Sequence, residues 1–258
     1  MIQVVNYKED LLQAGYENAF FSPLILGAHL VIYGKGDGYR FNSPAKSIDI
    51  VGHELAHYFL EYSHAGKLPY YEQPGAINEH VSDVIGMSIK AKKTESEGRE
   101  PLDYSGDFWR LGADWLVQAH MSVRHMLKPG TAYNHSDYGK DTQPAHMKNF
   151  VVTPFDAGGV HSNSGILNRT FALFAESVET PLYDLPLKIW LQAIKNVKHE
   201  PSFRDLAVAL VLTAKDFDGY KDSKGQSLEQ KMKDACQKTG ILDYVVNNSV
   251  VIKAPHAE

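Results

Sequence analysis

The stretch Ile48-Asp-Ile-Val-Gly-His-Glu-Leu-Ala-His-Tyr-Phe-Leu-Glu-Tyr62 decides how the rest of the chain is interpreted. Its apolar residues recur at the spacing of one helix face: Ile48, Val51, Leu55 and Phe59. The stretch therefore predicts an amphipathic helix. His53 and His57 are four residues apart, so on a helix both imidazoles lie on one face, about 6 Å apart along the axis, and can bind one metal ion. Glu54 follows His53 directly and can point to a water that such an ion holds.

A second predicted helix, from Ala76 to about Lys92, supplies a candidate third ligand. It contains Asn78-Glu-His-Val-Ser-Asp83, and two histidines with one glutamate are a known ligand set for a catalytic zinc ion. Glu79 is the candidate ligand, and Asp83, one turn further on, can accept the second ring N–H of a ligand histidine. His80 points about 100° away from Glu79 on such a helix, so we interpret it as a bystander. Two alternatives to a metal site stay open. His53 and His57 could be surface or core histidines without a metal, and the polar residues of the second helix could form a solvated face.

Composition excludes several classes of protein. The 258 residues, 43% hydrophobic and 22% charged, are ordinary for a globular chain. With 26 basic against 31 acidic residues, the net charge is −5, which argues against nucleic acid as a partner. A membrane span is not expected, because the most apolar early stretch, 20–33, is too short and is interrupted by Pro23 and His29. The single cysteine, Cys236, excludes an intramolecular disulfide and is interpreted as a core residue.

The order of predicted elements indicates an α+β protein. Residues 1–48 have the pattern of strands and loops, with a strand at Leu30–Tyr33 and a hairpin turn at Gly34–Gly38. A short helix is expected at Gly106–Val117 within an irregular middle region. The last third is predicted to be helical, over 161–179, 184–197, 202–216 and 227–239, and Ser202 and Ser227 have the pattern of helix-start caps.

Five segments in the same order resemble the thermolysin family of zinc metalloproteases. They are His53–His57, Gly75–Asp83, Val123–Met126, Asp156–Gly165 and Asn18–Phe21, the last preceding the others in the chain. The resemblance implies a zincin fold with a reduced N-terminal β-containing lobe over 1–66, a mainly helical lobe over 67–258, and the active-site helix between them. Since the first matching motif appears at residue 18, we expect either a compact variant that closes its cleft with residues 1–48 or a piece of a longer precursor.

The resemblance implies a role for each catalytic position. His53, His57 and Glu79 would bind Zn²⁺, and Glu54 would take a proton from the attacking water. His161 would stabilise the developing oxyanion, with Asp156 orienting it. The assisting tyrosine is expected just before Gly75; counting back selects Tyr70, with Tyr71 adjacent. Asn78 and Asp83 would hold the ligand histidines from behind.

The same resemblance implies how substrate binds. Asn18 and Ala19 would lie on the edge strand that holds the peptide, and Arg124 would hold a substrate carbonyl. An apolar pocket for the residue after the scissile bond would be lined by Phe41, Ile50 and Val123. Cleavage before bulky hydrophobic residues is therefore expected.

The family's double calcium site is predicted to be absent. In calcium-binding relatives several carboxylates face the position of Asp49, but here Lys90 and Arg110 occupy two of the matching positions. A double site needs several anionic oxygens, and the Lys90 ammonium can replace the ion's charge beside Asp49. The remaining acidic residues leave room for one weakly bound ion: Asp103, Asp107 and Asp114.

The favoured function is a zinc endopeptidase. Its rivals are a zinc aminopeptidase, disfavoured because no Gly-x-Met-Glu-Asn segment is present, and a zinc-binding but inactive interaction protein. Expected partners are a peptide or protein substrate and a pro-segment or inhibitor protein, with no nucleic acid and no membrane. The resemblance implies secretion, yet Met1–Asp10 has no signal-peptide pattern, so the location is left open.

Overall fold

The computed structural model describes residues 1–8, 17–25, 28–63, 68–100, 102–104, 107–217, 219–247 and 250–253. Within these residues there are six α-helices: α1 (Ile48–Ser63), α2 (Glu72–Ser96), α3 (Asp156–Ser177), α4 (Leu185–Asn196), α5 (Phe203–Asp216) and α6 (Leu228–Thr239). All six occupy positions where the sequence predicts a helix. The second is longer than predicted, since α2 begins four residues before Ala76 and ends four residues after Lys92. None of the described helices is long and apolar enough to cross a membrane.

The N-terminal part forms a three-stranded sheet in the order β1-β3-β2. Strand β3 (Ala28–Gly34) contains the predicted strand; it pairs parallel with β1 (Ile2–Tyr7) and antiparallel with β2 (Ala19–Ile25). Three two-stranded ribbons follow: β4 (Arg110–Leu111) with β5 (Arg124–His125), β6 (Asn134–His135) with β7 (Gly139–Lys140), and β8 (Tyr244–Asn247) with β9 (Val250–Lys253). Two single-turn helices complete the elements, η1 (Pro44–Lys46) and η2 (Met147–Asn149).

The predicted hairpin at Gly34–Gly38 is wrong in one respect. The chain does turn there, because Asp37 Oδ1 accepts the backbone N–H groups of Tyr39, Arg40 and Phe41 at 2.8 Å each. The segment that follows does not pair back onto β3. It crosses to the loop after β4, where Phe41 forms an isolated bridge with Leu116.

The predicted helix at Gly106–Val117 is also wrong. Over the described part of that segment, the chain forms β4 and a series of turns. Gly112 has φ +71°, which a helix does not allow, and a Cβ there would lie 2.7 Å from Val123 Cγ2. The glycine therefore ends β4 in a tight turn against the neighbouring strand.

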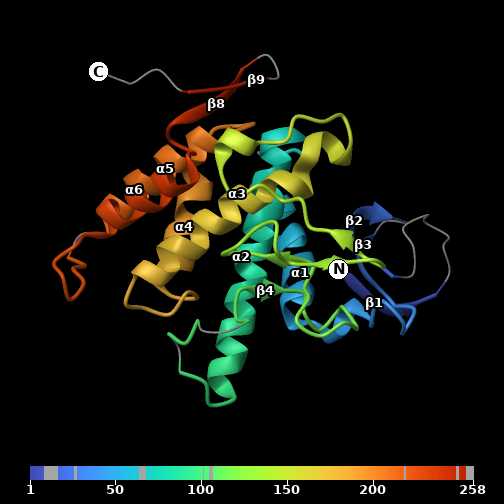
Figure 1. Ribbon diagram of the computed structural model, residues 1–258. Coiled ribbons are helices and arrows are strands. Elements are labelled where there is room, and N and C mark those ends of the chain that lie inside the picture. Colours follow the sequence, from blue (N-terminus) through green and yellow to red (C-terminus); the bar gives the residue numbers. More distant parts are fainter. Residues whose placement is uncertain are drawn as a thin grey trace.

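Helix α2 is the centre of the molecule. Figure 1 shows it between α1 and α3, with the three-stranded sheet beyond α1 and helices α4 to α6 on the opposite side. Helices α1 and α2 approach closely because glycines face each other: a Cβ on Gly86 would lie 2.3 Å from Asp49 O, and one on Gly52 would lie 2.9 Å from Gly86 Cα. This close crossing brings one face of α1 against the acidic residues of α2.

The main apolar core lies among α2 to α6. Its fully buried aromatic side chains include Trp109, Trp190, Phe171, Phe174 and Phe203. Cys236 is buried there too, as predicted. Ser202 and Ser227 cap α5 and α6 by accepting from the N–H groups of Asp205 and Gln230. The architecture is the predicted α+β combination, but the predicted lobe boundary at 66–67 lies outside the described residues.

Candidate active site

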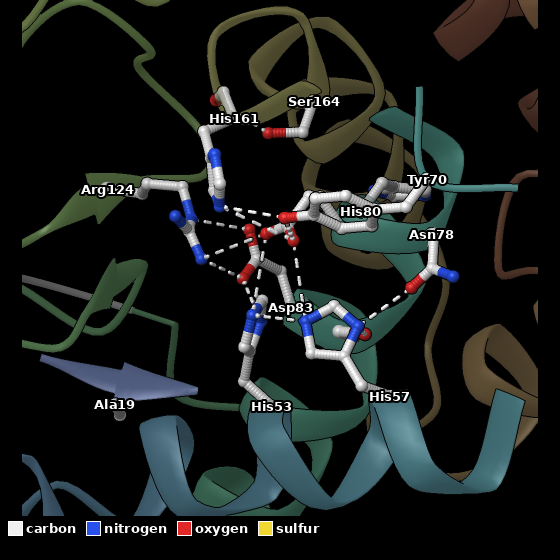
Figure 2. A network of polar contacts seen from close by, with 12 residues as sticks. Ala19, His53, His57, Tyr70, Asn78, His80, Asp83, Arg124, His161 and Ser164 are labelled. Atoms are coloured by element: carbon white, nitrogen blue, oxygen red, sulfur yellow. Dashed lines mark hydrogen bonds and ion pairs between the residues drawn. The ribbon is translucent and has the colours of Figure 1, made fainter. Parts of the chain in front are cut away.

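His53 and His57 project from one face of α1 toward Glu79 of α2. Their Nε2 atoms lie 3.0 Å apart, and the Glu79 carboxylate lies 3.5 Å from the first and 3.4 Å from the second. One ligand atom from each residue falls within 4.8 Å of the others. Figure 2 shows the two imidazoles side by side above α1. The three predicted ligands therefore meet at one point.

The opposite nitrogen of each imidazole faces an oxygen. His53 Nδ1 lies 2.7 Å from Asp83 Oδ1, and His57 Nδ1 lies 2.8 Å from Asn78 Oδ1. The Asn78 amide is oriented by a bond from its Nδ2 to Leu68 O at 3.3 Å. Carboxylate and amide oxygens only accept, so both Nδ1 atoms carry hydrogen and both Nε2 atoms turn toward each other.

This arrangement calls for a cation between the two Nε2 atoms. Glu79 Oε2 is buried without a hydrogen-bond partner among the described residues. Burial alone would raise the pKa of Glu79, but the nearby charges of His161, His57 and His53 lower it to about 2. Burial disfavours charge on His53 as well, yet contact with Asp83 and the charge of Glu79 raise its pKa. Two imidazole nitrogens and a buried carboxylate fit a zinc ion.

Glu54 lies on α1 beside His53 and faces the same cleft. Its side chain is buried, and burial, helped by the charge of Glu79, raises its pKa to about 7. A carboxyl group with such a pKa can both accept and release a proton near neutral pH.

His161 and Tyr70 close the site from the far side. Tyr70 Oη donates to Glu79 Oε1 at 2.5 Å and lies 3.1 Å from His161 Nε2. Tyr71 instead precedes α2 as its N-cap residue. Of the two tyrosines that the sequence leaves open, Tyr70 is the one that the structure brings to the site.

An unusual backbone segment holds His161 in place. Asp156, Ala157, Gly158 and Gly159 all have positive φ, between 48° and 88°, before the regular part of α3 begins. The turn brings Asp156 back onto His161: Oδ1 lies 2.5 Å from His161 Nδ1, and Oδ2 accepts the His161 backbone N–H at 2.9 Å. These two contacts with Asp156 fix the orientation of the His161 ring.

Arg124, on β5, is buried against the carboxylates behind the histidines. Its Nη2 donates to Asp83 Oδ1 at 2.8 Å, its Nε lies 2.7 Å from Asp83 Oδ2, and Nη2 is 3.8 Å from Glu79 Oε2. In Figure 2 the guanidinium approaches from the side opposite His57. Arg124 thus neutralises Asp83 while its side chain also lines the cleft.

A cleft of about 380 Å³ runs past these groups. Its lining includes the predicted substrate-binding residues Asn18, Ala19, Ile50, Val123 and Arg124, together with Glu54 and His161. Phe41 lines an adjoining cavity of about 480 Å³, which shares Asn18 and Val123 with the cleft. Sequence reasoning missed Trp115, Tyr133 and Gln143, which also line the cleft. These residues come from irregular loops and carry no spacing signal.

Asp49, at the start of α1, pairs with a lysine instead of facing a ligand set. Lys90 Nζ lies 3.2 Å from Asp49 Oδ2 and donates to Arg110 O at 2.5 Å. Asp49 also accepts from the Ser47 hydroxyl at 2.6 Å and the Gly112 N–H at 3.1 Å. Arg110 pairs with Asp107 at 2.8 Å. The ammonium group therefore lies where the sequence predicts it, beside Asp49.

Comparison with known proteins gives concordant similarities. The thermolysin metallopeptidase family matches through its catalytic domain over residues 1–61 and its alpha-helical domain over residues 66–241. An extracellular metalloprotease of Pectobacterium carotovorum subsp. carotovorum is 38% identical over 192 residues, covering 74% of this chain and 50% of the relative. Protease PrtS of Photorhabdus sp. (strain Az29) is 32% identical over 222 residues, covering 84% of this chain and 55% of the relative.

A solved structure has a similar fold. The precursor of protealysin, a metalloproteinase from Serratia proteamaculans, superimposes with a TM-score of 0.73 at 34% identity, covering 88% of this chain and 66% of that chain. The chain thus spans about half the length of the two curated relatives named above.

Proposed function

Because this chain belongs to the thermolysin metallopeptidase family, and its fold is the α+β fold of that family with a helical C-terminal domain, we propose that it is a zinc-dependent endopeptidase. The observation that carries the proposal is the meeting of His53, His57 and Glu79 within 4.8 Å, beside Glu54 in one cleft. These three residues would hold Zn²⁺. When bound, zinc polarises the substrate carbonyl and makes water more acidic.

Glu54 is the proposed general base. Its buried carboxylate accepts a proton from the attacking water and passes it to the leaving amine. In the metal-free site burial raises its pKa to about 7, which favours uptake of the proton.

His161 and Tyr70 are the proposed donors to the oxyanion. Burial disfavours charge on His161, but Glu79 and the bond to Asp156 raise its pKa, which favours a proton on Nε2. Asp156 acts through orientation, because it fixes both the ring and the backbone of His161. Asn78 and Asp83 fix the ring orientation of His57 and His53 in the same way.

Substrate is proposed to bind as an added strand. In the order β1-β3-β2, strand β2 is an edge of the sheet, and Asn18 and Ala19 at its start line the cleft. An extended peptide can pair with such an edge through backbone hydrogen bonds. Arg124 is proposed to hold a carbonyl group of that peptide. The apolar side chains of Phe41, Ile50 and Val123 support a preference for bulky hydrophobic residues after the scissile bond.

Three further expectations belong to this proposal. The Lys90–Asp49 pair supports the absence of a double calcium site. The similar solved structure is that of a protease precursor, which supports a pro-segment as a partner of this chain. The names of relatives described as extracellular support secretion.

The test is hydrolysis of an internally quenched peptide with both ends blocked. We expect cleavage before a bulky hydrophobic residue, abolished by a zinc chelator and by Glu54→Gln. Chelator-insensitive cleavage would contradict the zinc mechanism. Cleavage confined to peptides with a free amino terminus would indicate an aminopeptidase, and zinc binding without any cleavage would indicate an interaction protein.

A further inference from the structure

We propose that Trp190, His80 and Asn168 form a positioning relay that sets the orientation and ring tautomer of the zinc ligand His53 through Asp83. The inference rests on the proposed zinc site. The relay residues lie outside the cleft lining and come from three helices: Trp190 from α4, His80 from α2 and Asn168 from α3. Each of the three is fully buried.

Three short hydrogen bonds lead from Trp190 to Asp83, and a close charged contact links Asp83 to His53. Trp190 Nε1 donates to His80 Nε2 at 2.7 Å, and His80 Nδ1 lies 2.8 Å from Asn168 Oδ1. Asn168 Nδ2 donates to Asp83 Oδ2 at 2.8 Å. The other oxygen of Asp83 lies 2.7 Å from His53 Nδ1. Of these residues, Figure 2 labels His80 and Asp83, both on α2, and His53 on α1.

The chemistry of each group fixes the direction of every bond. An indole N–H can only donate, so His80 Nε2 must be the accepting nitrogen and its hydrogen must sit on Nδ1. His80 Nδ1 then donates to Asn168, which places the amide oxygen toward His80 and the amide N–H toward Asp83. A flipped amide would set its oxygen against the Asp83 carboxylate and its N–H against the N–H of His80.

The far end of the chain is the metal site. Asp83 is fully buried; its Oδ1 accepts a hydrogen bond from Arg124 Nη2, and its Oδ2 is ion-paired with Arg124 Nε. Together with Asn168, Arg124 holds the plane of this carboxylate. With the carboxylate so fixed, His53 Nδ1 carries the hydrogen and Nε2 is left for the metal. Outer partners of metal ligands typically change metal affinity by about 10- to 100-fold.

This assignment gives His80 a role that its sequence position conceals. It follows Glu79 directly, yet its ring points into the helical core, where it contacts Trp190 with ring centroids 6.1 Å apart. His80 is therefore a positioning residue, and it acts on the site only through Asn168 and Asp83.

The test compares two tryptophans of the same core. Trp190→Phe removes the N–H at the start of the relay. Trp109→Phe removes the N–H that donates to Glu176 at 2.9 Å, a bond not connected to the site, from an equally buried ring. Zinc dissociation constants are measured on chelator-treated protein by competition with a chromogenic chelator. We expect Trp190→Phe to weaken zinc binding by about 3- to 10-fold, Asn168→Ala by more, and Trp109→Phe by less than twofold.

A spectroscopic measurement tests the ring tautomer of His80 directly, in the wild type and in Trp190→Phe. In protein labelled with ¹⁵N-histidine, His80 is expected as the Nδ1-protonated tautomer, and Trp190→Phe is expected to release a mixture of tautomers. An Nε2-protonated His80 in the wild type would overturn the relay, and so would equal zinc affinity of the Trp190→Phe and wild-type proteins. If the wild type itself fails to bind one zinc ion, the proposed function fails instead.

Discussion

The α1–α2 interface contains a buried carboxylate near each of its two ends, Asp49 and Glu79, and the charges around these two carboxylates differ. Near one end, Asp49 is buried but receives Lys90, a hydroxyl and a backbone N–H from the chain itself. Near the other, Glu79 is buried, and its Oε2 has no hydrogen-bond partner among the described residues. Two imidazole nitrogens face the Glu79 carboxylate, and Arg124 lies 3.8 Å from Oε2. A buried carboxylate needs a countercharge. At the first end one carboxylate has one cation, Lys90, whereas at the second two carboxylates, Asp83 and Glu79, share Arg124. The second end is therefore proposed to take a further cation from solution.

The largest expected effect comes from changing Glu79, at the end of the interface that holds the proposed metal site. Glu79→Gln removes the charge but keeps the shape, so we expect zinc affinity to fall at least about 100-fold and peptidase activity by on the order of 10³-fold. Bound zinc and hydrolysis of a blocked, quenched peptide are measured together. Unchanged zinc stoichiometry and affinity in this variant would remove Glu79 from the ligand set.

Removing the Lys90 ammonium beside Asp49 is expected to lower the stability of the fold and to leave zinc binding unchanged. Lys90→Met leaves Asp49 buried without its cation, so the free energy of unfolding is expected to fall by about 2–3 kcal/mol. Urea denaturation gives that value, and a zinc assay on the same sample provides the contrast with Glu79→Gln. Loss of zinc from Lys90→Met at a temperature where it is folded would show that the two ends are not independent.

Glu54 adds a pH dependence to the metal end. Its folded pKa of about 7 lies above the ordinary value of 4.5, so its contribution to stability is complete below pH 4.5 and is lost as pH rises through 7. In metal-free protein, Glu54→Gln is therefore expected to be more stable than the wild type by about 1–2 kcal/mol at pH 8, with little difference at pH 4.5. Denaturation at both pH values checks the sign, and a gain limited to the acidic sample would contradict it.

The smallest expected effect concerns calcium. Since Lys90 already neutralises Asp49, the melting temperature of the wild type is expected to change by less than about 2 °C when millimolar Ca²⁺ is added or removed. Differential scanning calorimetry measures this directly. A shift of many degrees would show that a calcium site exists despite the ammonium group.

Much of the fold could be predicted because its helices have strong apolar periodicity. The helix over 48–62 and the four helices of the last third follow that pattern closely. The helix predicted over 106–117 was wrong because the apolar residues of this segment lie in turns. The positive φ of Gly112, which excludes a helix there, cannot be recognised from the spacing of apolar residues. The course of the chain after Gly38 was missed because it depends on a contact between Phe41 and Leu116, far away in the sequence.

The residues of the site likewise fall into those that the sequence could predict and those that it could not. His53, His57 and Glu79 could be predicted because each pattern lies within one helix turn. The choice of Tyr70 over Tyr71 could not, because it depends on how the chain enters α2. Asn168 and Trp190 were missed for a similar reason: each looks like an ordinary core residue until the helices are packed together.

The glycine contact between α1 and α2 has a consequence for how accurately the ligands are held. Side chains can change rotamer to absorb a small displacement, but Gly86 meets Asp49 O through backbone atoms alone. The separation of the two ligand-bearing helices is therefore a fixed length of the fold. One added methyl group at Gly86 would act as a spacer, moving Glu79 away from both histidines at once while leaving every ligand in the sequence unchanged.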